Sequence, residues 1–165
     1  MAYNSFLKLI NKNADTFTKD LIAEIRIRSE TPYYRQIPDQ ILYEQISQVI
    51  KNVSERMVNW LRKSKPKNTL FAYYSEVGAQ RCREGIPLDE VVIVLMFIKR
   101  RIWHFFDGNK LYNEYKLNEL MELNYYITLF FDRIIHSTIS GYQKQLGSIV
   151  TAHDFADDTL DKIFP

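Results

Sequence analysis

The sequence has few of the residues on which several common protein classes depend. Its single cysteine, Cys82, excludes an intrachain disulfide framework and a zinc site built from several cysteines. Five glycines and five prolines in 165 residues are few, which argues against a turn-rich β-sandwich or barrel. The longest fully apolar run, Val91–Ile98, is far shorter than the roughly 20 residues that cross a bilayer, so no membrane association is expected.

Charge of one sign is also scarce. The 22 Lys and Arg residues and 20 Asp and Glu residues give a formal net charge of +2, too small to favour nucleic acid as a partner. The first residues lack the basic and apolar regions of a secretory signal, so a cytoplasmic location is expected. Hydrophobic residues make up 46% of the chain and aromatic residues 14%, which is enough to bury one core.

Apolar residues recur at three- and four-residue steps along most of the chain, and this period predicts helices. The first helical segment runs from Ser5 to about Arg28, with a polar stretch at 11–15 that leaves two shorter helices open. A second helix is expected to have Pro38 as its first residue. A third is expected over 69–84, with Asn68 as its N-cap.

Two glycines lead to separate predictions about the third helix. Gly85 is expected to end it, because glycine favours the left-handed conformation that follows many helices. Gly78 lies within it, where glycine costs about 1 kcal/mol relative to alanine. We therefore expect another helix to approach closely at Gly78.

The segment Leu88–Phe106 is the hardest to assign, because its β-branched residues also suit a buried strand. Acidic residues begin it, the basic residues Lys99–Arg101 come late, and no partner strand is found elsewhere, which together favour a helix at the buried centre of a bundle. The last pattern, from about Tyr115 to Ile149, predicts a helix of roughly 35 residues. The predicted fold class is all-α, a single bundle of five or six helices with a long C-terminal helix.

Residues for catalysis or metal binding are scattered. The histidines His104, His136 and His153 do not have the spacing of a known ligand motif, so no metal site is predicted. No nucleophile elbow, phosphate-binding loop or dinucleotide fingerprint is found, and no catalytic residue is assigned. An all-α chain of this length could hold haem through His104 or His136, so a haem- or small-molecule-binding sensor is the alternative interpretation.

Basic residues next to apolar ones suggest an internal polar cluster. By helical geometry, at least one residue of Lys99–Arg101 points toward the bundle, and Arg81 shares a face with apolar residues. A buried arginine needs a carboxylate or carbonyl groups as partners. The cluster is either an ion pair between the third and fourth helices or a site for a small anionic or polar ligand. Its expected members are Arg81, Arg100, Arg101 and Trp103.

The stretch Gly78–Val91, followed by Lys99–Trp103, resembles the pattern G-x-x-R…G-x-P-L-x-E-V…R-x-x-W of RsbRD-type N-terminal domains. These are helical sensory domains of stressosome co-antagonist proteins, and they also precede some bacterial histidine kinases. Residues 32–41 upstream and 131–142 downstream extend the resemblance over nearly the whole chain.

The resemblance implies a globin-like fold without haem that pairs into a homodimer and passes a signal to a STAS or kinase domain. It supplies no catalytic residue, so a non-enzymatic input domain of bacterial signal transduction without a cofactor is expected. Residues 1–150 would form the helical sensory domain and residues 151–165 a tail or the start of a linker. The expected dimer interface comprises Ile134, Ile135, Tyr142 and Leu146.

Overall fold

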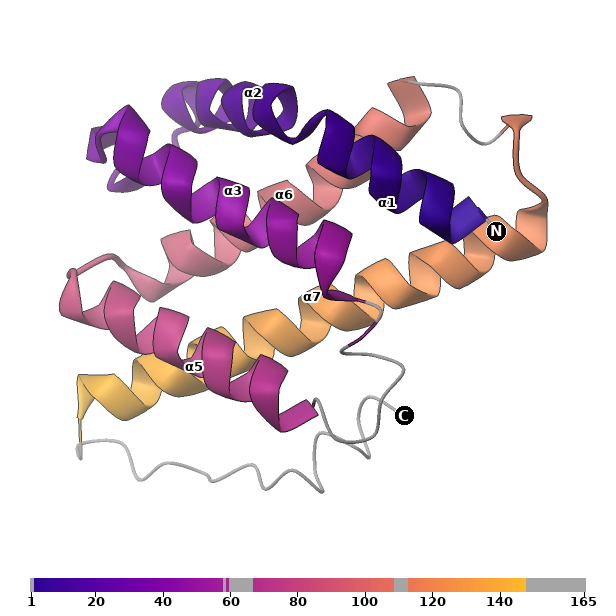
Figure 1. The fold of residues 1–165 in the computed structure, drawn as a ribbon. Helices are drawn as coiled ribbons and strands as arrows, with labels where there is room; N and C mark the ends of the chain where they lie inside the picture. Colours follow the sequence, from indigo (N-terminus) through magenta and orange to yellow (C-terminus); the bar gives the residue numbers. More distant parts are fainter. Residues whose placement is uncertain (1, 58, 60–66, 109–112, 148–165) are drawn as a thin grey trace.

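The computed structural model describes residues 2–57, 59, 67–108 and 113–147 of the chain. Within these residues the chain forms six α-helices, one turn of 3-10 helix and no strand, which confirms the all-α prediction (Figure 1). The elements are α1 (Ala2–Lys12), α2 (Ala14–Ile27), the 3-10 turn η1 (Tyr34–Gln36), α3 (Asp39–Glu55), α5 (Lys67–Arg83), α6 (Leu88–Gly108) and α7 (Leu117–Leu146).

The long helix α7 runs across the bundle and packs against α5, α6 and α1 (Figure 1). Helices α1 and α2 both pack on α3, and α2 also packs on α6. Helices α3 and α5 make few direct backbone contacts with each other. One hydrophobic core joins all six helices, and its fully buried members include Phe6, Leu21, Leu42, Tyr74 and Phe130.

The first helical segment is divided in two at Asn13. The backbone N–H of Asn13 donates to the carbonyl groups of Leu9 and Ile10, and its side-chain amide donates to Leu9 O at 2.9 Å. These hydrogen bonds end α1 at this residue, and α2 begins directly afterwards. Of the two options that the polar stretch left open, two shorter helices is the correct one.

Two predicted helix starts are wrong by one or two residues. Pro38 is the N-cap of α3 and not its first residue, since Leu42 N–H donates to Pro38 O at 3.0 Å. Helix α5 begins at Lys67, so Asn68 lies inside the helix and is not its N-cap. The N-cap preference is statistical, and lysine is a good helix former that can occupy a first turn.

Gly85 terminates helix α5 as predicted, two residues after the last helical residue, Arg83. Gly85 has φ +72°, its N–H donates to Cys82 O, and the N–H of Ile86 donates to Arg81 O. This pair of hydrogen bonds is the Schellman motif, which supplies donors to the last carbonyl groups of the helix. Helix α7 has 30 residues rather than about 35. It begins after Lys116, whose N–H donates to Glu119 Oε2, and it is followed by Gly147 with φ +119°.

The segment Leu88–Phe106 is a helix, but its apolar side chains are not buried on every side. Val91, Phe97 and Ile98 are buried, whereas Met96 is 54% exposed and Val92 is half-buried. One face of α6 therefore reaches the surface next to α7. The prediction of a helix is confirmed. Most of its apolar residues are buried in the core, and the side that carries Met96 is exposed.

The close approach predicted at Gly78 is confirmed. A Cβ atom added to Gly78 would lie 1.9 Å from the carbonyl oxygen of Thr138 on α7. A Cβ atom added to Gly141 would lie 1.7 Å from the carbonyl oxygen of Ser75 on α5. Two glycines on facing helices thus allow the backbones of α5 and α7 to touch at this crossing.

Candidate functional site

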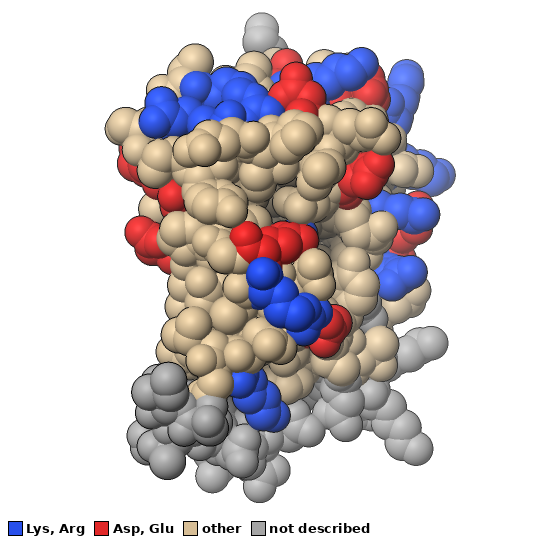
Figure 2. All heavy atoms as spheres, turned by 90° about the vertical axis from the view of Figure 1, so that its left-hand side faces the viewer, with Lys and Arg blue, Asp and Glu red and all other residues tan. Residues whose placement is uncertain are grey.

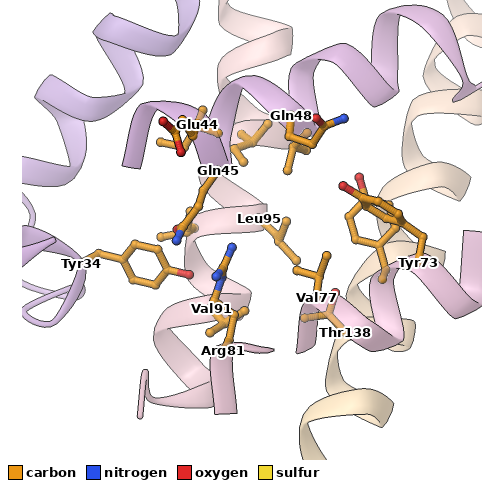
Figure 3. A pocket seen from close by; sticks show the side chains of 15 residues that line it. Tyr34, Glu44, Gln45, Gln48, Tyr73, Val77, Arg81, Val91, Leu95 and Thr138 are labelled. Atoms are coloured by element: carbon orange, nitrogen blue, oxygen red, sulfur yellow. The ribbon is translucent and has the colours of Figure 1, made fainter. Parts of the chain in front are cut away.

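A cavity of about 300 Å³ lies where α3, α5 and α6 face one another, and it is partly open to the surface beside the exposed Glu44 (Figure 3). Helix α6 contributes apolar side chains that include Val91, Leu95 and Ile98, and α5 contributes Val77. One residue of η1, Tyr34, closes one end, and one residue of α7, Thr138, also lines the cavity. The exposed wall surface is mostly apolar, and α3, α5 and η1 also bring polar side chains to it.

Three of these polar side chains converge at one end of the cavity (Figure 3). Gln45 comes from α3, Arg81 from α5 and Tyr34 from η1. The guanidinium of Arg81 is largely buried and donates to Glu84 Oε2 at 2.7 Å, so its charge is neutralised within its own helix. Burial raises the pKa of Tyr34 to about 12, although the nearby charge of Arg81 opposes this. The tyrosine hydroxyl therefore stays protonated.

Two buried oxygen atoms of the cavity wall have no hydrogen-bond partner among the residues that the structure describes. They are Oε1 of Gln45 and Oγ1 of Thr138, and Thr138 is fully buried. A buried polar atom without a partner costs about 1–3 kcal/mol. The chain therefore loses stability by placing these two atoms on the cavity wall.

Sequence reasoning missed both residues, although a signal was there. Gln45 lies three residues after Leu42 and four before Val49, so the helical period places it on the apolar face of α3. Thr138 lies in the same way on the apolar seam of α7. A polar residue on the apolar face of a buried helix needs a partner, and this requirement marks such positions in a sequence.

A fully satisfied polar chain lies beside the cavity. The amide of Gln48 donates to Asn52 Oδ1 at 3.2 Å, and the amide of Asn52 donates to the hydroxyl of Tyr74 at 3.0 Å. Asn52 and Tyr74 are both buried, and burial raises the pKa of Tyr74. Because α3 and α5 have few backbone contacts, these side chains fix the distance between the two helices that border the cavity.

Glu90 positions the end of the cavity that Tyr34 closes. Its carboxylate is buried in the first turn of α6 and accepts the backbone N–H groups of Tyr33 and Tyr34, at 2.9 and 3.1 Å to Oε2. On the other side of η1, the guanidinium of Arg26 donates to the carbonyl oxygens of Tyr34 and Ile37. The short turn is therefore held from both α6 and α2.

The structure does not bring the four residues of the predicted polar cluster together. Arg81 lines the cavity, whereas Arg100 and Arg101 lie on the opposite side of α6 and face α2. Arg100 Nη2 lies 3.0 Å from Glu24 Oε1, and Arg101 Nη2 lies 3.2 Å from Asp20 Oδ2. These ion pairs connect α6 to α2, and not α6 to α5 as the ion-pair interpretation expected.

The arginines face α2 because two carboxylates of α2 lie within reach there, about 80 positions earlier in the chain. The guanidinium of Arg100 also stacks over the ring of Phe97, with 4.9 Å between Cζ and the ring centroid. Trp103 is half-buried on yet another face of α6, beside Met96 and Ile135. Only Arg81 of the four predicted residues is thus in the cavity.

The four predicted dimer residues are also separated. Ile134 is fully buried in the core, and Tyr142 is 9% exposed with its hydroxyl donating to Ile86 O at 2.8 Å. Both are packed within their own chain and offer almost no surface to a partner. Ile135 is half-buried and Leu146 is 58% exposed, so these two remain accessible.

An apolar surface extends along α7 and the neighbouring face of α6. A groove between the two helices is lined by Val92, Met96, Trp103 and Ile135, and the ion pair between Lys99 Nζ and Asp132 Oδ1 (3.5 Å) lies at its side. Further exposed or half-buried apolar residues continue the same face of α7: Leu117, Met121, Tyr125, Ile139 and Leu146. We call this surface the α6–α7 face.

His104, His136 and Cys82 lie outside the cavity. His104 is exposed, and His136 is half-buried on α7, where burial lowers its pKa. Neither of these haem candidates is among the residues that line the 300 Å³ cavity. Cys82 is half-buried and free. His153 lies outside the described residues. Over the ranges that the structure describes, no three side chains of the metal-binding types come together.

Charged side chains of both signs gather over α2 at the top of the face shown in Figure 2, and mostly uncharged residues cover the part below it. The mixture of signs on this face agrees with the small net charge of the chain. No helix in the described part of the chain has both the length and the apolar composition needed to cross a bilayer.

The comparisons with known proteins give one match. The family model described as "RsbT co-antagonist protein rsbRD N-terminal domain" matches residues 15–154, most of the chain. No curated protein and no solved structure is significantly similar to the chain. The matching family is regulatory and stressosome-related, and its match includes α2 to α7 with the cavity and the α6–α7 face. This chain therefore belongs to the RsbRD N-terminal domain family of signalling domains.

Proposed function

We propose that this domain is a non-enzymatic signal input that works as a cytoplasmic homodimer and transmits its signal by repacking helices. The family match over residues 15–154 is the observation that carries the signalling role. The receiver of the signal is proposed to be a STAS or kinase domain, as the resemblance to RsbRD-type domains implies.

The α6–α7 face supports pairing with a second copy of the chain. Met121, Tyr125, Ile135, Ile139 and Leu146 follow one another at spacings that keep them on one side of α7. A helix of 30 residues is about 45 Å long, so two copies have the length to bury the area of a stable interface. A face that carries its own repeating apolar pattern suits a twofold dimer, in which each copy offers the same surface.

Helix repacking needs parts that can move against each other. The glycine crossing joins α5 firmly to α7, whereas α3 meets α5 mainly through the side chains of Asn52 and Tyr74. A ligand or partner that favours one arrangement of these two parts shifts the population toward it, while equal affinity for both arrangements shifts nothing. Helices α6 and α7 carry the shift to the dimer because both contribute to the α6–α7 face.

The homodimer is tested by sedimentation equilibrium at micromolar concentration. We expect a dimer, and we expect Met96→Glu and Tyr125→Glu to weaken it at least tenfold, because each places a charge on the apolar face. Ile27→Glu is the matched control: Ile27 is 81% exposed on α2, so the same charge there should leave the dimer intact. A monomeric wild-type chain, or equal weakening by all three variants, would contradict the proposed interface.

A further inference from the structure

We propose that the 300 Å³ cavity binds a small, uncharged, mainly apolar molecule whose one polar end donates a hydrogen bond to Gln45. This inference rests on the proposed function, because it identifies the kind of signal that the domain receives. The family description names no role for this cavity, and the cavity is separate from the α6–α7 face.

The volume of the cavity sets the size of the molecule. A cavity of 150 Å³ is known to hold benzene, and one water occupies about 30 Å³ in the liquid. A cavity of about 300 Å³ therefore has room for roughly ten non-hydrogen atoms. Its walls from Val77, Val91, Leu95 and Ile98 are apolar, so most of these atoms are carbon.

The unpartnered oxygen atom of Gln45 sets the polar end. Gln45 Oε1 can only accept a hydrogen bond. A hydroxyl or amide group at the end of the cavity that Gln45 shares with Tyr34 and Arg81 would donate to this atom (Figure 3). A molecule without such a group would leave Gln45 Oε1 unpaired and would bind less tightly.

The charges near this end favour an uncharged molecule. The cation of Arg81 is paired with Glu84, and both oxygens of the buried Glu90 accept backbone N–H groups of the η1 turn. Glu44, which is exposed, lines the cavity on the side of α3. An added anion would face more negative than positive charge. An added cation at this end would be repelled by Arg81, while Glu84 and Glu90 already have their own partners (Figure 3).

The position of the cavity connects binding with the proposed signal. The cavity lies between α3 on one side and α5 and α6 on the other, and these are the parts that few backbone contacts join. A molecule that fills it contacts both parts at once. Binding therefore favours the arrangement in which the cavity is formed over any arrangement in which it is not.

The test uses four probes of suitable size on the complete 165-residue chain: 4-propylphenol, propylbenzene, 4-propylbenzoate and 3-phenylpropylammonium. Binding is measured by the shifts of backbone amide signals in an NMR titration. We expect 4-propylphenol to bind most tightly, with the largest shifts at residues around the cavity. Tighter binding of either charged probe, or no binding of the phenol, would overturn the proposal.

Variants of the polar end give the second part of the test. Gln45→Leu should weaken binding of 4-propylphenol about tenfold and leave propylbenzene unchanged, because it removes the accepting oxygen atom. Thr138→Val lies on the other side of the cavity and should leave binding of both probes unchanged (Figure 3). Since Gln45 Oε1 and Thr138 Oγ1 have no partner among the described residues, both variants should keep or raise the Tm. Binding of the phenol that Gln45→Leu does not weaken would overturn the proposal.

Thr18→Val is the matched control. Thr18 is also fully buried, but its hydroxyl donates to Ala14 O at 2.7 Å. This variant should lower the Tm and leave probe binding unchanged. Val77→Phe, which places a ring in the cavity, should abolish binding of both uncharged probes, and retained binding would overturn the proposal. A dimer that binds no probe would refute only the cavity assignment, whereas a monomer that binds the phenol would refute only the dimer.

Discussion

At the scale of the residue, the crossing of α5 and α7 leaves the least room for change. Gly78 and Gly141 each face a backbone carbonyl group on the other helix, and backbone atoms cannot move aside as a flexible side chain can. Gly108, at the end of α6, has no heavy atom within 4 Å of an added Cβ. The same substitution therefore has opposite consequences at these positions.

We predict that Gly78→Ala and Gly141→Ala each lower the free energy of unfolding by about 1–3 kcal/mol, the usual range for overpacking, despite the better helix propensity of alanine. Gly108→Ala is the control and should be neutral or slightly stabilising. Urea unfolding followed by circular dichroism measures all three. Equal stability of the three variants would mean that the helices do not touch at the glycines.

Glu90 is a second residue whose buried surroundings determine how much a substitution changes the stability of the fold. Glu90→Gln keeps the shape of the side chain but loses the charge that the N–H groups of Tyr33 and Tyr34 donate to, so we expect a loss of about 1–3 kcal/mol in unfolding free energy. Asp89→Asn removes the same charge from an exposed neighbour in the same turn and should have a much smaller effect. Thermal unfolding compares the stability of the two variants directly. Similar losses of stability would show that the hydrogen bonds to the Glu90 carboxylate do not stabilise the fold.

Sequence patterns predicted the needs of single residues well where these needs arise within one helix. The need for a close approach at Gly78 follows from the cost of glycine within a helix, but the identity of its partner, Gly141, does not. Arg100 and Arg101 were expected to need carboxylates, yet their partners on α2 are far away in the chain. A partner that only the fold brings near cannot be read from helical spacing.

At the scale of the element, the ends of helices were predicted best where a glycine stops them. The Schellman motif at Gly85 needs a positive φ, which glycine adopts without a steric cost, so the residue itself marks the end. Helix starts at Asp39 and Lys67 were less exact, because several residue types can precede a first turn. The exposed face of α6 was missed because a run of apolar residues does not show which neighbours cover it.

The contact between α2 and α6 is an element-scale feature that depends on pH. Burial would raise the pKa of Glu24, but the hydrogen bonds from Arg28 and Arg100 outweigh it and hold this pKa below the usual 4.5. The folded chain thus keeps the carboxylate ionised at a lower pH than the unfolded chain does. Its stabilising contribution is present above pH 4.5 and is lost as the pH falls through the folded-state pKa.

We therefore predict that the Tm of Glu24→Gln falls less steeply than that of the wild type when the pH is lowered below 4.5, because the variant has no carboxylate to protonate. Differential scanning calorimetry across this range makes the measurement. Glu55→Gln, in an exposed position of α3, is the control for the change in net charge. Parallel curves for the wild type and Glu24→Gln would contradict the assignment.

At the scale of the whole molecule, α3 and α5 face each other across the cavity. The hydrogen bond between Asn52 and Tyr74 joins them directly, and both side chains are buried. The sequence predicted the bundle and its long last helix from periodicity alone. It did not predict the cavity, since the space left between helices depends on how all of them pack.

We predict that Tyr74→Phe and Asn52→Ala are coupled by about 0.5–3 kcal/mol in unfolding free energy, since each removes one partner of the same buried hydrogen bond. A double-mutant cycle by urea unfolding measures this coupling. The pair Tyr74→Phe and Thr18→Val, with Thr18 bonded within α2, is the control cycle and should be additive. Additive effects in both cycles would show that the two parts are not connected through this bond.

The two glycines also place the tightest contact of the longest helix far from its middle, since Gly141 lies near the C-terminal end of α7. Helix α5 packs on α7 more extensively than any other helix does. A displacement of α5 would therefore be handed on to the last turns of α7 with little loss, so these two helices would act as one rigid lever arm.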